Sequence, residues 1–491
     1  MLRPPRTPLS TALAAGAAAS VLTVAAAAPF LGRYGWDRDE LYFLTASRHP
    51  ALGYVDFPPV AAWVAWVVRH IAGNSLVALR VVSLVCGVAT VFFVALTARE
   101  LGGKRAAQFG AALAWAITPF VLGSASIFHP TWFDALAWTT FLYLATRILL
   151  RPEPWLWPLL GLIAGVGLEA KYTIVFLLVA FGVALAAFER RTLRTRGPWV
   201  ATALALVLIA PNLVWQARHG WPSVHFASSQ NAKTADDTSP PQYVVEQLLF
   251  LGGTFVIAVI GVVALWRRRL RALAALPVLI TFAFLVERGR SYYPLPADAL
   301  AVAAGAVALE AWAHRRRRLV LAALAVLQAA TLVAVAPIVV PVLSTGAMVR
   351  HGIWKQSFYK DEIGWPELTS QVVAAWNALP PAERANGAIV ALNYGEASAL
   401  ELYARGRLPL VLSGHLSWQY WRPRALAQRH LLTVGYGSGT LRAICRSWRV
   451  VARIDNRWRI DNEERGRAIA TCVLRQPLGE IWHPWFARDT L

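Results

Sequence analysis

The sequence predicts an α-helical polytopic membrane protein of about eleven spans, followed by a C-terminal extracytoplasmic α/β domain. Three observations lead to this prediction: the composition, a series of long apolar runs, and the placement of the basic residues. Hydrophobic residues make up 57% of the 491 residues and charged residues only 15%, against about 25% charged in a typical globular chain. A water-soluble protein could not hide so much apolar surface, so much of it must face lipid.

The apolar runs have the length of membrane spans, which need about 20 residues within a range of roughly 17 to 25. The first extends from Leu9 to Leu31, and its Ala-rich end would also suit a signal-peptide cleavage site. Ten further runs follow, at 76–98, 106–123, 132–150, 155–168, 172–188, 198–215, 243–265, 272–286, 294–313 and 319–343. Two of them, 155–168 and 272–286, are short for a membrane.

Basic residues occupy alternate connections between these runs. With a cytoplasmic N-terminus, every strongly basic connection lies on the cytoplasmic side, as the positive-inside rule requires. These connections hold Arg99, Lys104, Arg105, Arg147, Arg151, Arg190, Arg191, Arg194, Arg196, Arg267, Arg268, Arg269, Arg271 and Arg315 to Arg318. An odd number of spans then puts the C-terminal tail outside, with the protein in the plasma (inner) membrane. The net charge of +21 therefore reflects topology, and no nucleic-acid partner is expected.

The chain is expected to divide into a transmembrane domain, residues 1–343, with a first outer loop at 32–75, and a soluble domain, residues 344–491. The tail contains no further spanning run, and its length suits one ordinary domain. Segments 387–392 and 408–412 are typical of buried strands, and 365–379 of a helix. Cys445 and Cys472 both fall in this exported tail, where we predict a disulfide; two buried free thiols are the alternative.

Acidic residues favour the outer side: eleven of the fifteen that precede the tail lie there. The densest group is Asp37–Glu40, four consecutive charges that follow the first apolar run. Asp56 and two prolines then introduce the run 60–71, in which Trp63, Trp66 and His70 share one helical face. We expect an amphipathic helix in the membrane interface. Charges beside such a helix could serve a lipid headgroup and a polar substrate, although a solvated helix cap would show the same residues.

Other outer connections also carry polar side chains. His129 and Asp134 lie between the third and fourth runs, and Lys171 lies between the fifth and sixth. A long polar connection up to Pro241 is expected to be a mobile cover. The turn at 287–294 contains Arg288, Arg290, Tyr292 and Tyr293. Arginines on the outer side break the basic pattern, and phosphate binding would explain them.

Two segments of the first outer loop resemble a known family. Trp36-Asp37-Arg38-Asp39-Glu40-Leu41-Tyr42-Phe43 and Gly53-Tyr54-Val55-Asp56-Phe57-Pro58-Pro59 are similar to the first outer loop of the GT-C glycosyltransferases of family 39. This family includes protein O-mannosyltransferases and the aminoarabinose transferases that modify lipid A. The resemblance continues through Asp134, Lys171-Tyr172-Thr173, 211–216, 290–293, 393–397 and 413–415, and so covers most of the chain.

The resemblance implies a GT-C fold of about eleven to thirteen spans and a sugar donor carried on a polyprenyl phosphate. It implies an inverting transfer to an extracytoplasmic lipid, glycan or protein, with Asp39 as the general base and Glu40 as the second acid of the family's pair. The donor phosphate is expected to meet the outer cations and hydroxyls, Lys171, Arg288, Arg290, Tyr292 and Tyr293. Further substrate contacts are expected from Arg38, Asp56, Asp134 and His129.

The sequence also departs from the family. Tyr42 stands where the aminoarabinose transferases have Arg, and their Glu-Lys-Pro motif becomes Asp56-Phe57-Pro58, which keeps the carboxylate and loses the Lys. These differences argue against aminoarabinose transfer to lipid A. No cofactor follows from the sequence, and a divalent metal at Asp56 is left open.

Two rival functions remain. A lipid or sugar transporter, or flippase, would usually place charges near mid-membrane, whereas the charges here lie at the ends of the runs. A non-catalytic scaffold that displays the tail would not depend on Asp39.

Overall fold

The computed structural model describes residues 7–151, 153–312, 315–355 and 358–490. The chain forms two compact units. The helical unit comprises the chain up to Leu31, Val77–Ala217 and Gln230–Val342, and the loop–tail unit comprises Gly32–Leu76, Arg218–Ser229 and Leu343–Leu491. This division differs from the expected one in two respects, because the first outer loop and the segment Arg218–Ser229 both group with the tail.

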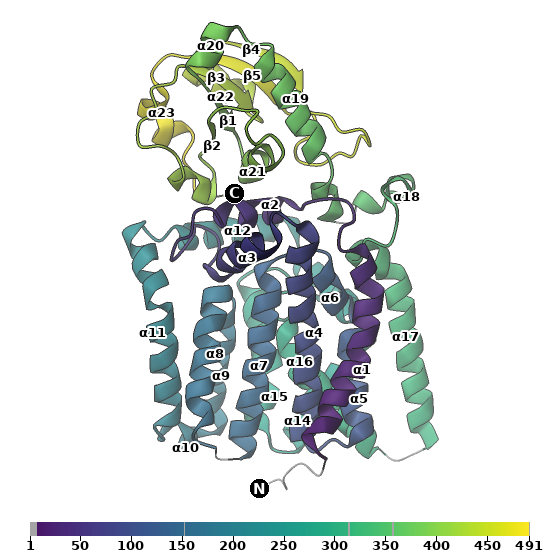
Figure 1. The fold of residues 1–491 in the computed structure, drawn as a ribbon. Coiled ribbons are helices and arrows are strands. Elements are labelled where there is room, and N and C mark those ends of the chain that lie inside the picture. Colours follow the sequence, from purple (N-terminus) through teal and green to yellow (C-terminus); the bar gives the residue numbers. More distant parts are fainter. Residues whose placement is uncertain (1–6, 152, 313–314, 356–357, 491) are drawn as a thin grey trace. The chain divides into compact units, whose positions relative to one another are not determined.

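The helical unit is a bundle of apolar helices, and each expected run lies on one or two of them (Figure 1). They are α1 Leu9–Ala27, α4 Leu76–Glu100, α5 Arg105–Ala116, α6 Pro119–Leu122, α7 Pro130–Leu150, α8 Leu156–Ala170, α9 Ile174–Phe188, α10 Arg190–Leu193, α11 Gly197–Arg218, α13 Pro240–Leu251, α14 Thr254–Arg267, α15 Arg271–Val286, α16 Leu295–Ala311 and α17 Arg315–Val339, with short 3-10 turns η1 Ala28–Phe30 and η2 Gly123–Ala125. Among the described residues, five helices are long and apolar enough to span a membrane, or six with one bent pair, and α8, α9 and α15 are shorter apolar helices. The count of eleven spans stays a prediction.

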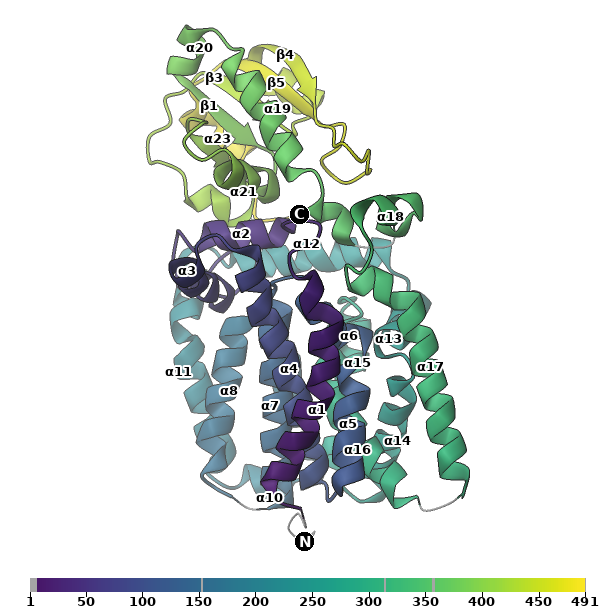
Figure 2. The same cartoon turned by 45° about the vertical axis from the view of Figure 1, so that its right-hand side comes forward.

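The expected span at 243–265 is not one continuous helix. The chain forms α13 and α14 there, two helices bent by 100° relative to each other (Figure 2). The break falls at Gly252, whose φ of +58° is favourable for glycine and strained for other residues. A Cβ atom at this position would also lie 2.8 Å from Gln328 Oε1. The apolar run continues through the break, so hydropathy alone did not reveal it.

The polar connection after α11 is helical rather than an irregular cover. It forms α12, Pro222–Asp237, which begins at a proline, a residue suited to the first turn of a helix. The first eight residues of α12 belong to the loop–tail unit and the remainder to the helical unit.

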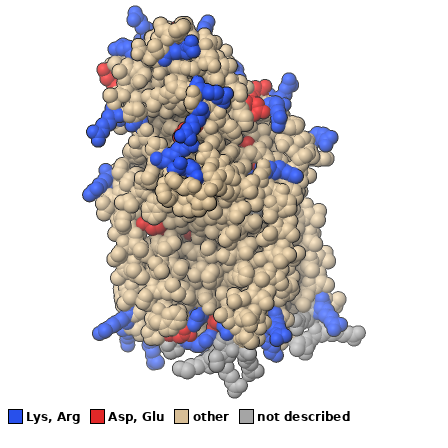
Figure 3. Space-filling view, in the orientation of Figure 1, with Lys and Arg blue, Asp and Glu red and all other residues tan. Residues whose placement is uncertain are grey.

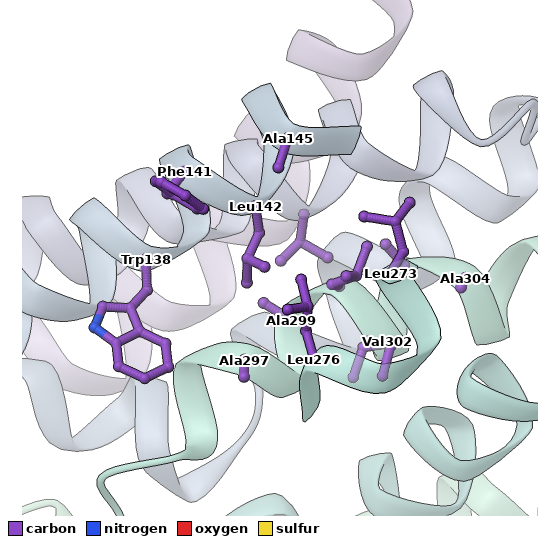
Figure 4. Packing of buried hydrophobic residues seen from close by; sticks show 14 of the residues in the cluster. Trp138, Phe141, Leu142, Ala145, Leu273, Leu276, Ala297, Ala299, Val302 and Ala304 are labelled. Carbon is purple, nitrogen blue, oxygen red and sulfur yellow. The ribbon is translucent and has the colours of Figure 1, made fainter. Parts of the chain in front are cut away.

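Close packing of small side chains holds the helical unit together. Trp138, Phe141, Leu142 and Ala145 of α7 lie against buried Leu and Ala residues of α15 and α16 (Figure 4). In a lipid environment, helices associate through such van der Waals packing and small residues rather than through water exclusion.

Basic connections meet at one end of the helical unit. Arg151 pairs with Glu100, and Arg268 Nη1 donates to the carbonyl oxygen of Leu101 at 3.0 Å. The connections that follow α4, α7 and α14 therefore lie together, and Lys and Arg side chains gather at this end (Figure 3). This agrees with the alternation seen in the sequence; the assignment of this end to the cytoplasm stays a prediction.

The loop–tail unit combines α2 Arg38–Ala46 and α3 Val60–Ala72 with an α/β domain from the tail. The tail contains α18 Thr345–Arg350, α19 Trp365–Asn377, α20 Pro381–Ala385, α21 Tyr394–Tyr403, α22 Ser438–Ile444 and α23 Leu478–Trp485, with 3-10 turns η3 Ile353–Lys355, η4 Phe358–Glu362 and η5 Leu416–Tyr420. Its strands are β1 Gly387–Ala391, β2 Val411–Ser413, β3 His430–Val434, β4 Cys445–Arg453 and β5 Ala468–Leu474. The predicted tail helix and both predicted strands are confirmed by α19, β1 and β2.

The sheet has the order β2-β1-β3-β5-β4. β1 pairs in parallel with β2 and β3, while β5 is antiparallel to β3 and β4. Cys445 of β4 and Cys472 of β5 form a disulfide, with their Cα atoms 5.6 Å apart. In α3, Trp63 and Trp66 are about two-fifths exposed, and the rings of Trp66 and His70 lie 4.1 Å apart. These side chains share one helical face, as the sequence predicted, and membrane contact by α3 stays a prediction.

Candidate active site

The acidic segment of the first outer loop forms the start of α2. Asp37 is the N-cap, and its Oδ1 accepts a hydrogen bond from the Asp39 backbone N–H at 2.8 Å. Glu40 completes a capping box, since its Oε2 accepts from the Asp37 backbone N–H at 2.9 Å. Burial, with Asp39 and Glu40 nearby, raises the pKa of Asp37 well above its usual range. Asp37 and Glu40 thus supply the two capping side chains, and Asp39 is the acid that the cap does not require.

Asp39 instead contacts the tail. The Tyr394 hydroxyl, at the first residue of α21, donates to Asp39 Oδ1 at 2.7 Å. Glu40 is fully buried, whereas Asp39 is partly exposed. The structure therefore assigns different surroundings to the two acids that were expected to form a catalytic pair.

Beside Asp39 and Tyr394, a second phenol, that of Tyr42, is hydrogen-bonded to a second carboxyl group, that of Asp56. The Tyr42 hydroxyl donates to Asp56 Oδ1 at 2.9 Å and accepts from the Ser417 backbone N–H at 2.9 Å. The rings of Tyr42 and Tyr394 are in contact, tilted by 32° with centroids 4.6 Å apart. Burial raises the pKa of Asp56 to about 8, and the nearby charge of Asp39 acts in the same direction. Two phenol–carboxyl pairs therefore form one cluster, which we call the acid cluster: Asp39, Tyr42, Asp56 and Tyr394.

Arg38, an expected substrate contact, is engaged by acids of the tail. Its guanidinium lies 2.5 Å from Glu463 and 3.5 Å from Asp361, and 6.0 Å from the centre of the Tyr394 ring. These contacts make Arg38 a link between the loop and the tail. Among the described residues, no group of three or more His, Cys, Asp and Glu side chains gathers to hold a metal ion, at Asp56 or elsewhere.

The helical unit holds a separate polar centre around the turn between α8 and α9. Thr173 in this turn donates to Asp134 Oδ2 at 2.7 Å, and the indole N–H of Trp138 donates to the other Asp134 oxygen at 2.8 Å. Tyr172 in the same turn donates to Asn212 of α11 at 2.8 Å. Asp134 is buried and both of its oxygens are occupied, so its visible role is to fix this turn rather than to face a substrate.

Lys171 projects from the fixed turn into a set of hydroxyl and aromatic groups. Its Nζ donates to Thr131 Oγ1 at 2.9 Å and lies 4.3 Å from the centre of the Tyr293 ring and 5.3 Å from that of Tyr292. His129 Nδ1 lies 2.8 Å from the same Thr131 oxygen. Three of the expected phosphate-binding residues, Lys171, Tyr292 and Tyr293, are thus brought together; we call this group the lysine cluster.

The two outer arginines are placed differently. Arg290 Nη2 lies 2.8 Å from the side-chain amide of Gln230 on α12, oriented so that the amide oxygen accepts. Burial raises the pKa of Tyr293, and Arg290 acts in the opposite direction, which places its charge near the lysine cluster. Arg288 is exposed on the same turn. Ser291 donates to Glu246 of α13 at 2.5 Å, so the bent helix α13 helps to hold this turn.

The sequence prediction missed the role of two groups. Tyr394 belongs to the tail segment 393–397, to which the sequence assigns no role, and no sequence pattern points to the Ser417 backbone. The available signal was the pattern Asn393-x-x-Glu396, a capping box that places Tyr394 at the first residue of a helix. No local pattern shows that this helix starts beside Asp39.

Comparisons with known proteins agree with this architecture. Residues 56–215 match the family model of dolichyl-phosphate-mannose-protein mannosyltransferases. In Rhizobium johnstonii, the lipopolysaccharide core galacturonosyltransferase RgtA is 28% identical over 48% of this chain, and the lipid A galacturonosyltransferase RgtD is 25% identical over 37%. The matched regions span only 44% and 38% of those two proteins.

A solved structure extends the comparison to nearly the whole chain. The fold is similar to that of ArnT from Cupriavidus metallidurans bound to undecaprenyl phosphate, with a TM-score of 0.57, 15% identity, and coverage of 94% of this chain and 97% of that one. At this identity the likeness concerns the fold. The family model over residues 56–215 and the fold over nearly the whole chain confirm the predicted resemblance to the GT-C glycosyltransferases of family 39.

Proposed function

We propose that this multi-pass membrane protein is an inverting glycosyltransferase that moves a sugar from a polyprenyl-phosphate donor to a lipid, glycan or protein acceptor outside the cytoplasm. The observation that supports it best is that the three acids at the start of α2 have different contacts. Asp37 and Glu40 cap the helix, while Asp39 is partly exposed and held by a phenol. Asp39 is therefore the acid suited to accept a proton.

The reaction needs one strong base. Asp39 takes the proton from the acceptor hydroxyl or amine as that atom attacks the anomeric carbon from the face opposite the phosphate. The bond between the anomeric carbon and the phosphate oxygen breaks, and the polyprenyl phosphate leaves with the electron pair. The leaving phosphate is a weak base, so cations can stabilise it and no general acid is required. A positioned base typically contributes about 10²–10⁴-fold to the rate.

The lysine cluster is suited to the donor phosphate. Lys171 lies on a turn that is fixed by hydrogen bonds donated to Asp134 of α7 and Asn212 of α11, and the rings of Tyr292 and Tyr293 lie beside its Nζ. Arg290 would add a second cation. Relatives are named as galacturonosyltransferases, and the ArnT structure is described as bound to undecaprenyl phosphate. These names support a lipid-linked donor for this chain.

The topology is part of the proposal. The basic end of the helical unit faces the cytoplasm, so the N-terminus is cytoplasmic and the tail extracytoplasmic. The acid cluster belongs to the loop–tail unit and would then work outside the cytoplasm, where lipid-linked donors are consumed without nucleotide sugars.

The test is turnover of a polyprenyl-phosphate-linked sugar by the purified protein in lipid, with mass analysis of the product. Asp39→Asn should bind donor normally and turn over at least about 10²-fold more slowly. Asp37→Asn is the matched control, because Asn caps a helix about as well as Asp and should keep near-normal turnover. Full activity of Asp39→Asn would exclude the assigned base, and an inactive Asp37→Asn would move that role to Asp37.

The same assay tests the phosphate site. Lys171→Met should raise the donor KM by about tenfold or more, because it removes one charged hydrogen bond to phosphate. Lys104→Met, at the basic end of the helical unit, is the control and should leave the KM unchanged. Equal KM values for the wild-type protein and Lys171→Met would remove Lys171 from the donor site.

A further inference from the structure

We infer that Tyr394 is a positioning residue for the glycosyl transfer, so that the tail domain supplies part of the catalytic apparatus rather than only covering it. The inference rests on the proposed function, because it assigns a task to the partner of Asp39. Its physical basis is one hydrogen bond, the packing that aims the phenol, and the anchoring of the helix that carries it.

The hydrogen bond joins residues 355 positions apart. The Tyr394 hydroxyl lies 2.7 Å from Asp39 Oδ1, a short distance typical of a bond to a charged acceptor. A carboxylate on a short side chain can rotate about its terminal torsion, which is broad in energy. Fixing Oδ1 restricts the rotation of the carboxylate and so sets its direction toward the acceptor whose proton it takes. Burial, with Asp39 beside it, raises the pKa of Tyr394 well above its usual range, so the phenol stays a donor.

Contacts with neighbouring rings fix the direction of the Tyr394 phenol. One neighbour is the ring of Tyr42, with centroids 4.6 Å apart, and another is the imidazole of His415, at 5.3 Å. The guanidinium of Arg38 lies 6.0 Å from the ring centre. Tyr42 is itself held by Asp56 and by the Ser417 backbone. The ring therefore has little freedom to turn its hydroxyl away from Asp39.

The helix behind the phenol is anchored by buried polar groups. Asn393 caps α21 by accepting from the Glu396 backbone N–H at 2.8 Å, and Glu396 accepts in return from the Asn393 and Leu392 backbones at 3.2 and 2.8 Å. The Asn393 amide also donates to Glu464 at 3.1 Å. Glu396 is fully buried, with Arg467 3.5 Å away. These bonds hold the first turn of α21, and with it Tyr394, in place.

The site also requires close approach of α2 and α21. A Cβ atom added at Gly395 would lie 2.3 Å from Arg38 Cγ and 3.1 Å from the Trp365 ring. The absence of a side chain at this position lets the backbone of α21 approach the residue next to Asp39. Each residue of the sequence Asn393-Tyr394-Gly395-Glu396 thus has one role. Asn393 caps α21, Tyr394 supplies the phenol, Gly395 allows the close contact with Arg38, and Glu396 anchors the start of the helix.

The experiment compares Tyr394→Phe with Tyr436→Phe in the full-length protein in lipid. Tyr394→Phe keeps the ring and removes the hydroxyl; we expect kcat to fall by about 10- to 100-fold while the donor KM stays within about twofold. The acid limb of the pH profile should also move to higher pH, because a carboxylate that loses a donor holds its proton more tightly. Tyr436 is a buried tail tyrosine whose hydroxyl lies 3.5 Å from the Ala391 carbonyl oxygen, and Tyr436→Phe should keep wild-type kcat.

Asp39→Asn and the double variant separate this inference from the proposed function. If Asp39→Asn is inactive and Tyr394→Phe has wild-type kcat and pH profile, the positioning role is refuted and the proposed function stands. If Asp39→Asn is fully active, the proposed base fails first. In the Asp39→Asn background, adding Tyr394→Phe should change the residual rate by less than about twofold, whereas a large additional loss at equal thermal stability would contradict action through Asp39.

Discussion

Replacing Gly395 with Ala tests the close contact between α2 and α21. The new Cβ atom would lie 2.3 Å from Arg38 Cγ, where real Cβ contacts essentially never fall below 3.0 Å. The two helices must therefore separate by at least about 0.7 Å, the difference between these distances, unless the Arg38 side chain abandons its ion pairs with Glu463 and Asp361. Either change disturbs the neighbour of Asp39.

The size of the effect follows from the same geometry. A shift of about 0.7 Å along the bond would lengthen the 2.7 Å contact between Tyr394 and Asp39 to about 3.4 Å, beyond the usual range of O–H···O bonds. We expect kcat to fall by about tenfold, the worth of one such hydrogen bond. Overpacking typically costs about 1–3 kcal/mol of folding free energy, partly offset by up to about 1 kcal/mol of helix propensity gained over Gly.

Gly439→Ala provides the matched control. Gly439 lies in α22 of the same domain, and a Cβ atom there would meet nothing within 4 Å. This variant should gain stability and keep wild-type kcat. The difference in kcat and stability between Gly395→Ala and Gly439→Ala therefore measures the effect of the clash with Arg38. The assay is donor turnover together with the midpoint of thermal unfolding in lipid. Wild-type kcat and an unchanged midpoint for Gly395→Ala would refute the argument from close approach.

Two further predictions concern the loop–tail unit. Replacing Cys445 and Cys472 together with Ala should destabilise the tail by about 3.5 kcal/mol, from the chain entropy of a loop closed over 27 residues, seen as faster hydrogen exchange in β4 and β5. Cys86→Ala is the control, and unchanged exchange in the double variant would contradict the prediction. Burial raises the pKa of Asp56 from 3.8 to about 8, so the folded state holds more protons between these values and stability should fall as pH rises through this range. Asp56→Asn keeps an acceptor for Tyr42 and should flatten this dependence between about pH 4 and pH 8; equal slopes would show that the carboxyl ionises normally.

Hydropathy predicted the helical unit well, because a spanning helix makes all its backbone hydrogen bonds within one continuous apolar segment. Every apolar run is found on a helix. The exception is the run at 243–265. It is apolar on both sides of the break, and the 100° bend falls at Gly252, whose positive φ hydropathy does not show. The helix α12 escaped prediction because its residues are polar and its apolar pattern is weak.

The candidate site could be predicted only in part. The charges of Asp37–Glu40 and the cation at Lys171 are visible in the sequence, since charged residues at the ends of apolar runs are conspicuous. The sequence does not show which acid caps α2, nor that Asp134 is occupied by Thr173 and Trp138. Such assignments depend on side-chain direction and on partners far along the chain.

The grouping of the first outer loop with the tail has a consequence for biosynthesis. Asp39 leaves the ribosome early, but its partner Tyr394 follows 355 residues later. At a synthesis rate of about 5–20 residues per second, Tyr394 is synthesised tens of seconds after Asp39. During this time the spans between them must be inserted, while the loop has neither Tyr394 nor the Ser417 backbone to hold its side chains. A nascent or truncated chain would therefore hold the sugar-transfer machinery in an inactive state, and maturation of the acid cluster becomes the last event of folding rather than the first.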